Sequence, residues 1–160
     1  MDAKGCGTLS GACGCGQLTY RLTSKPMFVH CCHCGECQKQ TGSAYVLNAI
    51  IEADRVVWEG KTTEHTLQTP SGKGQVITRC ADCGTAVFSS YLVRLGKLTY
   101  IRVGTLDNPD ECPPDVQIFT SSKQSWVPLS SDIPNFKEFY DFKDVWPAEA
   151  YTRLNTVFGE

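Results

Sequence analysis

Three groups of closely spaced cysteines constrain this 160-residue chain more than any other feature. The sequence carries a C-x-C pair at Cys13 and Cys15, a run with cysteines at 32, 34 and 37, and a C-x-x-C pair at Cys80 and Cys83. The N-terminal stretch lacks the apolar segment of a secretory signal, so we expect a reducing compartment, the cytoplasm. Patterned cysteines in such a compartment favour metal binding or catalysis over structural disulfides.

The first and third groups together supply four thiols for one metal ion. Residues two apart in an extended segment project to the same face, so Cys13 and Cys15 can point at one ion. A C-x-x-C turn followed by a glycine, here Gly84 after Cys80 and Cys83, is typical of a metal-binding knuckle. Because structural zinc takes four ligands, we predict a closed zinc site at these four cysteines. The alternative is a redox pair at Cys80 and Cys83, with unrelated core thiols at the other two positions.

The second group supplies three thiols, Cys32, Cys34 and Cys37. Three protein ligands and one open position are the hallmark of a catalytic zinc, and soft thiolate ligands suit a further thiol at the open position. We therefore predict a second, catalytic zinc that binds a thiol. Two alternatives stay open: a closed site with His30 or His33 as fourth ligand, and a metal-free redox cluster. By strand alternation, His33 points away from its neighbouring cysteines.

Signals for β-strands dominate the rest of the chain. Apolar and β-forming runs recur every 8–14 residues or so, which predicts a mainly β fold of folded antiparallel sheets. These runs occupy residues 17–22, 45–60, 62–69, 86–92, 97–107 and 116–122. Helix signals are confined to the segment after Cys34 and to 147–158, where a short C-terminal helix is expected. The length suits a single domain over 1–160, with a core of about 9–139.

Charge and hydropathy exclude two classes of partner. The formal net charge is −2, and the lysines and arginines are scattered singly, so a phosphate backbone would find no basic patch. No stretch approaches the roughly 18 apolar residues of a membrane span. We therefore expect neither a nucleic acid nor a membrane as partner.

Four segments resemble the glutathione-dependent formaldehyde-activating enzyme family, which also includes the centromere protein V domain. In chain order they read GACGCGQLTY, CHCGECQKQTGSAYV, RCADCGTAVF and SWVPLSSDIPNF, and the resemblance covers about residues 9–139. It implies a zinc-containing β-tent fold, shared with a Rab exchange factor and the B-type methionine sulfoxide reductases. It also implies two zinc sites with the cysteine groupings given above.

The resemblance further implies a carbon–sulfur lyase that adds glutathione, or a similar thiol, to formaldehyde or another small aldehyde. Lys39 and Arg79 lie next to the metal motifs, and Trp126 lies in the late aromatic segment, so we take these three as candidate substrate-binding residues. The chain departs from the family pattern at Gly35, where serine is frequent, and at Gln38, where arginine is frequent. These departures reposition the basic group expected near the second site.

Two other functions fit the same residues. A non-enzymatic, zinc-stabilised protein-binding module would need only the first site. A thiol redox switch would use the sulfurs of the second group. Cys6, Cys31 and Cys112 receive no role from the sequence.

Overall fold

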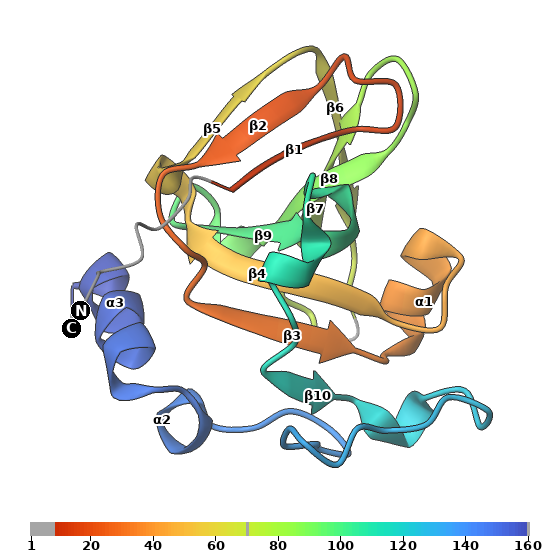
Figure 1. Ribbon diagram of the computed structural model, residues 1–160, viewed down its shortest axis with the longest axis vertical. Coiled ribbons are helices and arrows are strands. Elements are labelled where there is room, and N and C mark those ends of the chain that lie inside the picture. The colour runs from red at the N-terminus through yellow and green to blue at the C-terminus, as the bar shows by residue number, and fades with distance from the viewer. Residues whose placement is uncertain (1–8, 70, 160) are drawn as a thin grey trace.

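The computed structural model describes residues 9–69 and 71–159, so Cys6 lies outside the described residues (Figure 1). Within these ranges the chain forms ten strands, three α-helices and five 3-10 turns. The strands are β1 Ser10–Ala12, β2 Thr19–Leu22, β3 Phe28–Cys32, β4 Val46–Glu52, β5 Val56–Glu59, β6 Thr62–Leu67, β7 Gln75–Cys80, β8 Ala86–Tyr91, β9 Leu98–Arg102 and β10 Val116–Ile118. The helices are α1 Gly35–Thr41, α2 Phe142–Val145 and α3 Ala148–Phe158. The predicted mainly β fold with few short helices is confirmed.

The strands form two sheets. The smaller sheet has the order β1-β2-β5, and the larger has the order β10-β3-β4-β9-β8-β7-β6. The two apolar runs predicted in 45–60 become β4 and β5, which lie in different sheets and are separated by a 3-10 turn at Ala53–Arg55. All pairs are antiparallel except that of β10 with β3, which is parallel.

Two strands of the larger sheet carry no signal that the sequence analysis recognised. Strand β3 is buried at all five positions, so its sequence shows no alternation of polar and apolar residues. Strand β7 ends in Cys80, which the sequence assigns to a metal site, and no strand is predicted over its residues. Both strands deliver metal-ligand candidates at their carboxyl ends, Cys32 and Cys80.

The central strands of the larger sheet are buried on both faces, whereas the edge strand β6 is largely exposed. Successive residues of β4 point to opposite sides, and Ala49 and Ile50 belong to different core clusters. The first cluster lies between the sheets and includes Leu22 of β2 and Ile101 of β9. The second cluster lies on the opposite face, where the C-terminal segment and α3 pack against the sheet through residues such as Leu154 (Figure 1).

Helix α3 lies within 147–158, the range predicted from the sequence, and a buried ion pair fixes it to β4. The Arg153 guanidinium donates to both carboxylate oxygens of Glu52, at 3.0 and 2.6 Å, and Glu52 is 6% exposed. Burial acts to raise the pKa of Glu52, but the hydrogen bonds from Arg153, a backbone hydrogen bond and the charges of Arg153 and Arg55 together lower that pKa. The carboxylate is therefore ionised, and paired, at neutral pH.

Replacing Arg153 with methionine is expected to destabilise the fold by about 2–3 kcal/mol at pH 7, because it leaves a buried carboxylate without its partner. A lowered pKa in the folded state gives stability that is present above the unfolded pKa and lost as pH falls through the folded one. The difference between variant and wild type should therefore shrink below about pH 4. Urea unfolding at pH 7 and pH 3.5 measures both effects. Arg55→Met is the matched control, since Arg55 approaches the same carboxylate at 3.4 Å with its side chain 43% exposed. If Arg55→Met lost as much stability as Arg153→Met, the role given to the Arg153–Glu52 pair would be contradicted.

Candidate metal centres

The structure brings four cysteines together at one edge of the sheet pair. The Sγ atoms of Cys13, Cys15, Cys80 and Cys83 all lie within 4.8 Å of one another. The measured separations are 3.5 Å for Cys13 to Cys15 and 3.8 Å for Cys15 to Cys80. Four sulfurs around a tetrahedral zinc, at about 2.3 Å each, stand about 3.8 Å apart. The spacing of this four-thiol cluster therefore fits a zinc ion.

Two similar turns build the four-thiol cluster. In the first, the Cys13 N–H donates to the carbonyl of Leu18 at 2.9 Å, and in the second the Cys80 N–H donates to Thr85 at 3.0 Å. Gly84, at φ 73°, takes the left-handed conformation that closes the second turn and that glycine adopts without strain. The hydroxyl of Thr85 accepts the Gly14 N–H at 3.2 Å and so joins the two turns.

The four-thiol cluster links the two sheets. Cys13 follows β1 of the smaller sheet, whereas Cys80 ends β7 of the larger one. The two turns lie side by side at the top of the molecule in Figure 1. A metal ion held there would tie together segments more than sixty residues apart, because Cys15 and Cys80 are 65 positions apart in the sequence.

A second group of three thiols forms where β3 meets α1. The Sγ atoms of Cys32, Cys34 and Cys37 all lie within 4.8 Å of one another. Cys32 ends β3, Cys34 is the N-cap of α1, and Cys37 lies in the first turn of that helix. The Cys37 N–H donates to the Cys34 sulfur at 3.3 Å. Because α1 begins soon after β3 ends, the three closely spaced cysteines direct their side chains toward one point.

Each cluster contains a thiol that ionises readily. Hydrogen bonds from Cys32 and Cys37 lower the pKa of Cys34 to about 2. In the four-thiol cluster, the Thr85 hydroxyl, 3.1 Å from the Cys83 sulfur, lowers the pKa of Cys83 to about 5. Hydrogen bonds with neighbouring thiols raise the pKa values of Cys15, Cys32 and Cys37 instead. The thiolate is the form of cysteine that binds metals, so each cluster offers one favoured thiolate as a metal ligand.

The structure separates both nearby histidines from the three-thiol cluster. Among the described residues, the cluster has no fourth histidine, cysteine or carboxylate within the same 4.8 Å limit. His33 is fully buried and faces Cys31, with 3.5 Å between its Nε2 and the Cys31 sulfur, as strand alternation predicts. His30 instead lies 2.6 Å from the Tyr140 hydroxyl. The described geometry therefore favours a set of three protein ligands over a closed site.

A cavity of about 180 Å³ opens beside the three-thiol cluster, on the face of the larger sheet that lies away from the smaller one. The three cysteines line it together with His30 and Asn48 of the sheet, and aromatic side chains form much of the wall. These aromatic residues are Tyr91, Tyr100, Phe119, Phe139 and Phe142. The cavity gives a small molecule access to the sulfurs.

His30 reaches this cavity as a neutral imidazole. Burial lowers its pKa to about 3. The Trp146 indole N–H donates to the Tyr140 oxygen at 2.7 Å, and we assign the Tyr140 proton to the hydrogen bond with Nε2 of His30. With that assignment, the neutral imidazole carries its proton on Nδ1. His30 therefore lines the cavity as a neutral imidazole that can donate from Nδ1.

The structure does not bring Lys39, Arg79 and Trp126 to the cavity. Lys39 is exposed in the last turn of α1. Arg79 donates to the Gly84 carbonyl at 3.0 Å and to Gln40 at 3.1 Å, so it connects the turn of the four-thiol cluster to α1. Trp126 is 73% exposed. These positions do not support contact with a molecule in the cavity.

The departure at position 38 also has a structural role. The Gln38 amide donates to the backbone carbonyls of His33, at 2.7 Å, and Ser122, at 2.9 Å. It thus ties α1 to the segment after β10. The side chain supplies no charge to the cavity.

A buried cation that the sequence analysis missed lies near the three-thiol cluster. Arg102 is 6% exposed and donates to the side-chain oxygen of Asn48, its register partner on the neighbouring strand. Burial lowers the pKa of Arg102, while the thiols of Cys37 and Cys32 act to raise it. A positive charge at this depth favours the thiolate form of the cluster. In the sequence, an arginine within the apolar run 97–107 is the signal that could have revealed this buried cation.

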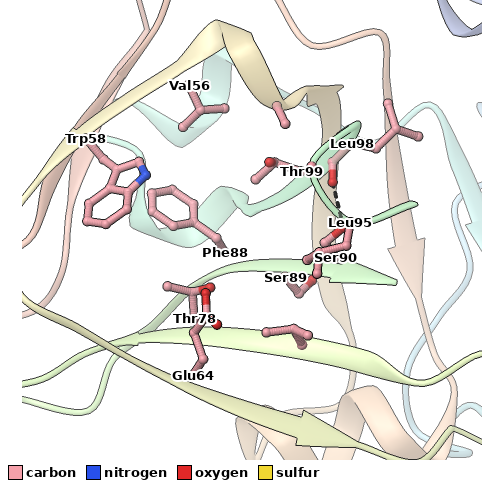
Figure 2. A pocket seen from close by; sticks show the side chains of 13 residues that line it. Val56, Trp58, Glu64, Thr78, Phe88, Ser89, Ser90, Leu95, Leu98 and Thr99 are labelled. Carbon is pink, nitrogen blue, oxygen red and sulfur yellow. Dashed lines mark hydrogen bonds between the residues drawn. The ribbon is translucent and has the colours of Figure 1, made fainter. Parts of the chain in front are cut away.

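A separate hollow of about 210 Å³ lies between β5 and the larger sheet, and Figure 2 shows Trp58 and Phe88 facing each other across part of it. Among the described residues that line it, none is a cysteine or histidine, and Glu64 is the one ionisable side chain. This hollow therefore lacks the donor set that either cluster offers.

The described residues also contain no helix long and apolar enough to cross a membrane.

A comparison with family models agrees with the first three of the four motif segments, while the fourth, at 125–136, lies beyond the match. A model of the family described as glutathione-dependent formaldehyde-activating enzyme matches residues 8–122. No curated protein matches the chain. Among solved structures, a crystal structure of a Rhodobacter sphaeroides protein is 13% identical, covers 79% of this chain and 99% of its own, and has a TM-score of 0.49. The family match spans well over half of the sequence and includes all seven cysteines of the two clusters. The chain belongs to the glutathione-dependent formaldehyde-activating enzyme family.

Proposed function

We propose that the protein is a zinc-dependent carbon–sulfur lyase that catalyses the reversible addition of glutathione, or a similar thiol, to formaldehyde or another small aldehyde. The four-thiol cluster would hold a structural zinc, and the three-thiol cluster a catalytic one. One observation carries the proposal: Cys32, Cys34 and Cys37 converge beside a cavity, and no fourth protein ligand closes the set among the described residues.

The donor chemistry supports zinc at both clusters. Sets of three or four thiolates are typical of zinc, and the four-thiol spacing suits its bond length. Zinc bound by the three thiolates would supply an open coordination position that keeps an incoming thiol in its ionised form.

The reaction itself needs a thiolate, a carbonyl and a proton. The substrate sulfur attacks the carbonyl carbon, so that a C–S bond forms and the carbonyl π pair moves to oxygen. That oxygen takes a proton and becomes the hydroxyl of the adduct, which balances the proton released when the thiol ionises. His30 can donate a hydrogen bond from Nδ1 to the oxygen as its charge develops. The buried Arg102 offsets part of the negative charge that gathers at the sulfurs.

Exchange spectroscopy by NMR with ¹³C-labelled formaldehyde tests the activity. Adding the zinc-loaded protein should raise the rate of exchange between free formaldehyde and its glutathione adduct by at least about tenfold over buffer. Protein stripped of metal by a chelator should lose this effect, and reloading with zinc should restore it. A rate equal to that of buffer, with two zinc ions still bound, would overturn the proposed reaction.

A further inference from the structure

A second hollow of about 240 Å³ continues the cavity beside the three-thiol cluster. The two share six lining residues, namely Ser71, Tyr91, Tyr100, Phe119, Phe139 and Phe142. The second hollow adds Lys73, from the loop before β7, and Arg94, from the 3-10 turn Leu92–Arg94 after β8. Together they form one groove with sulfurs at one end and two cations at the other, which we call the aromatic groove.

The guanidinium of Arg94 is held by aromatic rings. Its Cζ lies 5.2 Å from the ring centroid of Phe142 and 5.4 Å from that of Phe158. Cation–π contacts of this kind orient an arginine without neutralising it. The ion pairs of the described residues are those of Glu52 with Arg55 and Arg153, so Arg94 and Lys73 are in neither. Both charges remain available for an anion.

The charge of Arg94 acts inside the cavity. Burial raises the pKa of Tyr100, and the positive charge of Arg94 opposes that rise. Tyr100 lines the cavity together with the three cysteines. The described lining of the second hollow contains no acidic side chain, whereas Glu36 lies at the sulfur end. Arg94 and Lys73 therefore face no acidic side chain among the described residues that line the second hollow.

We propose that Arg94 and Lys73 form an anion subsite that binds a carboxylate of the thiol substrate, while its sulfur lies at Cys32, Cys34 and Cys37. The inference rests on the proposed function and narrows its substrate to low-molecular-weight thiols that carry a carboxylate beyond a spacer. The spacer packs against the aromatic walls. The cavity is several times larger than the roughly 30 Å³ of a water molecule, so formaldehyde alone does not fill it.

Isothermal titration of the zinc-loaded protein tests the subsite with two probes, glutathione and 2-mercaptoethanol, an uncharged thiol without a carboxylate. Arg94→Gln should weaken glutathione binding about tenfold, because a half-buried charge-assisted contact is lost. Lys73→Gln should weaken it about threefold, since Lys73 is exposed and screened by water. Neither variant should change 2-mercaptoethanol binding.

Lys97→Gln is the matched control. Lys97 also lies over the Phe158 ring, at 5.0 Å, but it does not line the aromatic groove among the described residues. The Lys97→Gln variant should bind glutathione like wild type. Thermal unfolding checks that each variant is folded. If the wild type binds both thiols and the two groove variants bind glutathione unchanged, the anion subsite is wrong and the proposed function stands. If the wild type with two zinc ions binds neither thiol, both are overturned.

Discussion

Replacing Cys80 with serine will remove the folded state under conditions where the wild type is stable. Cys80 lies at the end of β7 and is 1% exposed, so a serine there replaces both a candidate metal ligand and a core contact. Binding of structural zinc contributes on the order of 10 kcal/mol to folding, which exceeds the net stability of many domains of this size. Circular dichroism and zinc content of the purified variant measure the loss.

Cys112→Ser is the control for the removal of a buried thiol. Cys112 is 4% exposed and belongs to the core cluster between the sheets, but to neither thiol cluster. Burying a hydroxyl there should cost about 1–2 kcal/mol and leave the zinc content unchanged. If Cys80→Ser and Cys112→Ser lose the same amount of stability, the four-thiol cluster does not hold a structural metal.

Replacing Cys34 with serine should abolish activity while the fold persists. Serine is a favoured N-cap residue and can accept the Cys37 N–H as the cysteine does, so α1 should still begin at Gly35. The three-thiol cluster loses a ligand, so zinc content should fall from two ions per chain to one. Because loss of partners outside the ligand set already lowers metal affinity or activity about 10–100-fold, we expect the exchange rate with this variant to fall to that of buffer.

Cys31→Ser separates this effect from a general loss of sulfur. Cys31 lies in the same segment but contacts His33 and stands outside the three-thiol cluster. It should keep two zinc ions and activity close to wild type. A Cys34→Ser protein that keeps both zinc ions and its activity would show that the three-thiol cluster is not the reaction centre.

The clusters themselves could be predicted from the sequence because local spacing decides them. A C-x-C in an extended segment and a C-x-x-C at a turn must direct their sulfurs to one side, whatever the rest of the chain does. Four thiols are needed for a closed zinc site and three for an open one. This count divides the seven cysteines into the same two clusters as the structure. The out-of-phase position of His33 followed from the same alternation.

The cavity could not be predicted in this way. Its walls come from segments far apart in the chain, such as Tyr91 of β8 and Phe142 of α2, and only the fold brings them to the sulfurs of Cys32 and Cys37. Strand β3, which carries Cys32, has no alternating pattern because both of its faces are buried. Its parallel partner β10 was predicted as a strand, but not its place beside β3.

The candidate substrate residues show the same limit. Lys39 and Arg79 adjoin cysteines in the sequence, but Lys39 is exposed on α1 and neither residue lines the cavity among the described residues. Arg79 instead spans from Gly84 to Gln40 and so supports the framework that holds both clusters. The cations that line the aromatic groove, Arg94 and Lys73, adjoin no cysteine in the sequence.

Whether each thiol cluster holds one zinc ion is tested most directly by native mass spectrometry of the protein purified without added metal or chelator, with and without glutathione. The expected mass is that of the chain with two zinc ions. One further glutathione should be retained when the thiol is present. Cys34→Ser should show one zinc ion and retain no glutathione. A wild-type chain with a single zinc ion and no bound thiol would contradict the open three-thiol centre. A metal-free chain that is lighter by pairs of hydrogen atoms would mean disulfides and would contradict both centres.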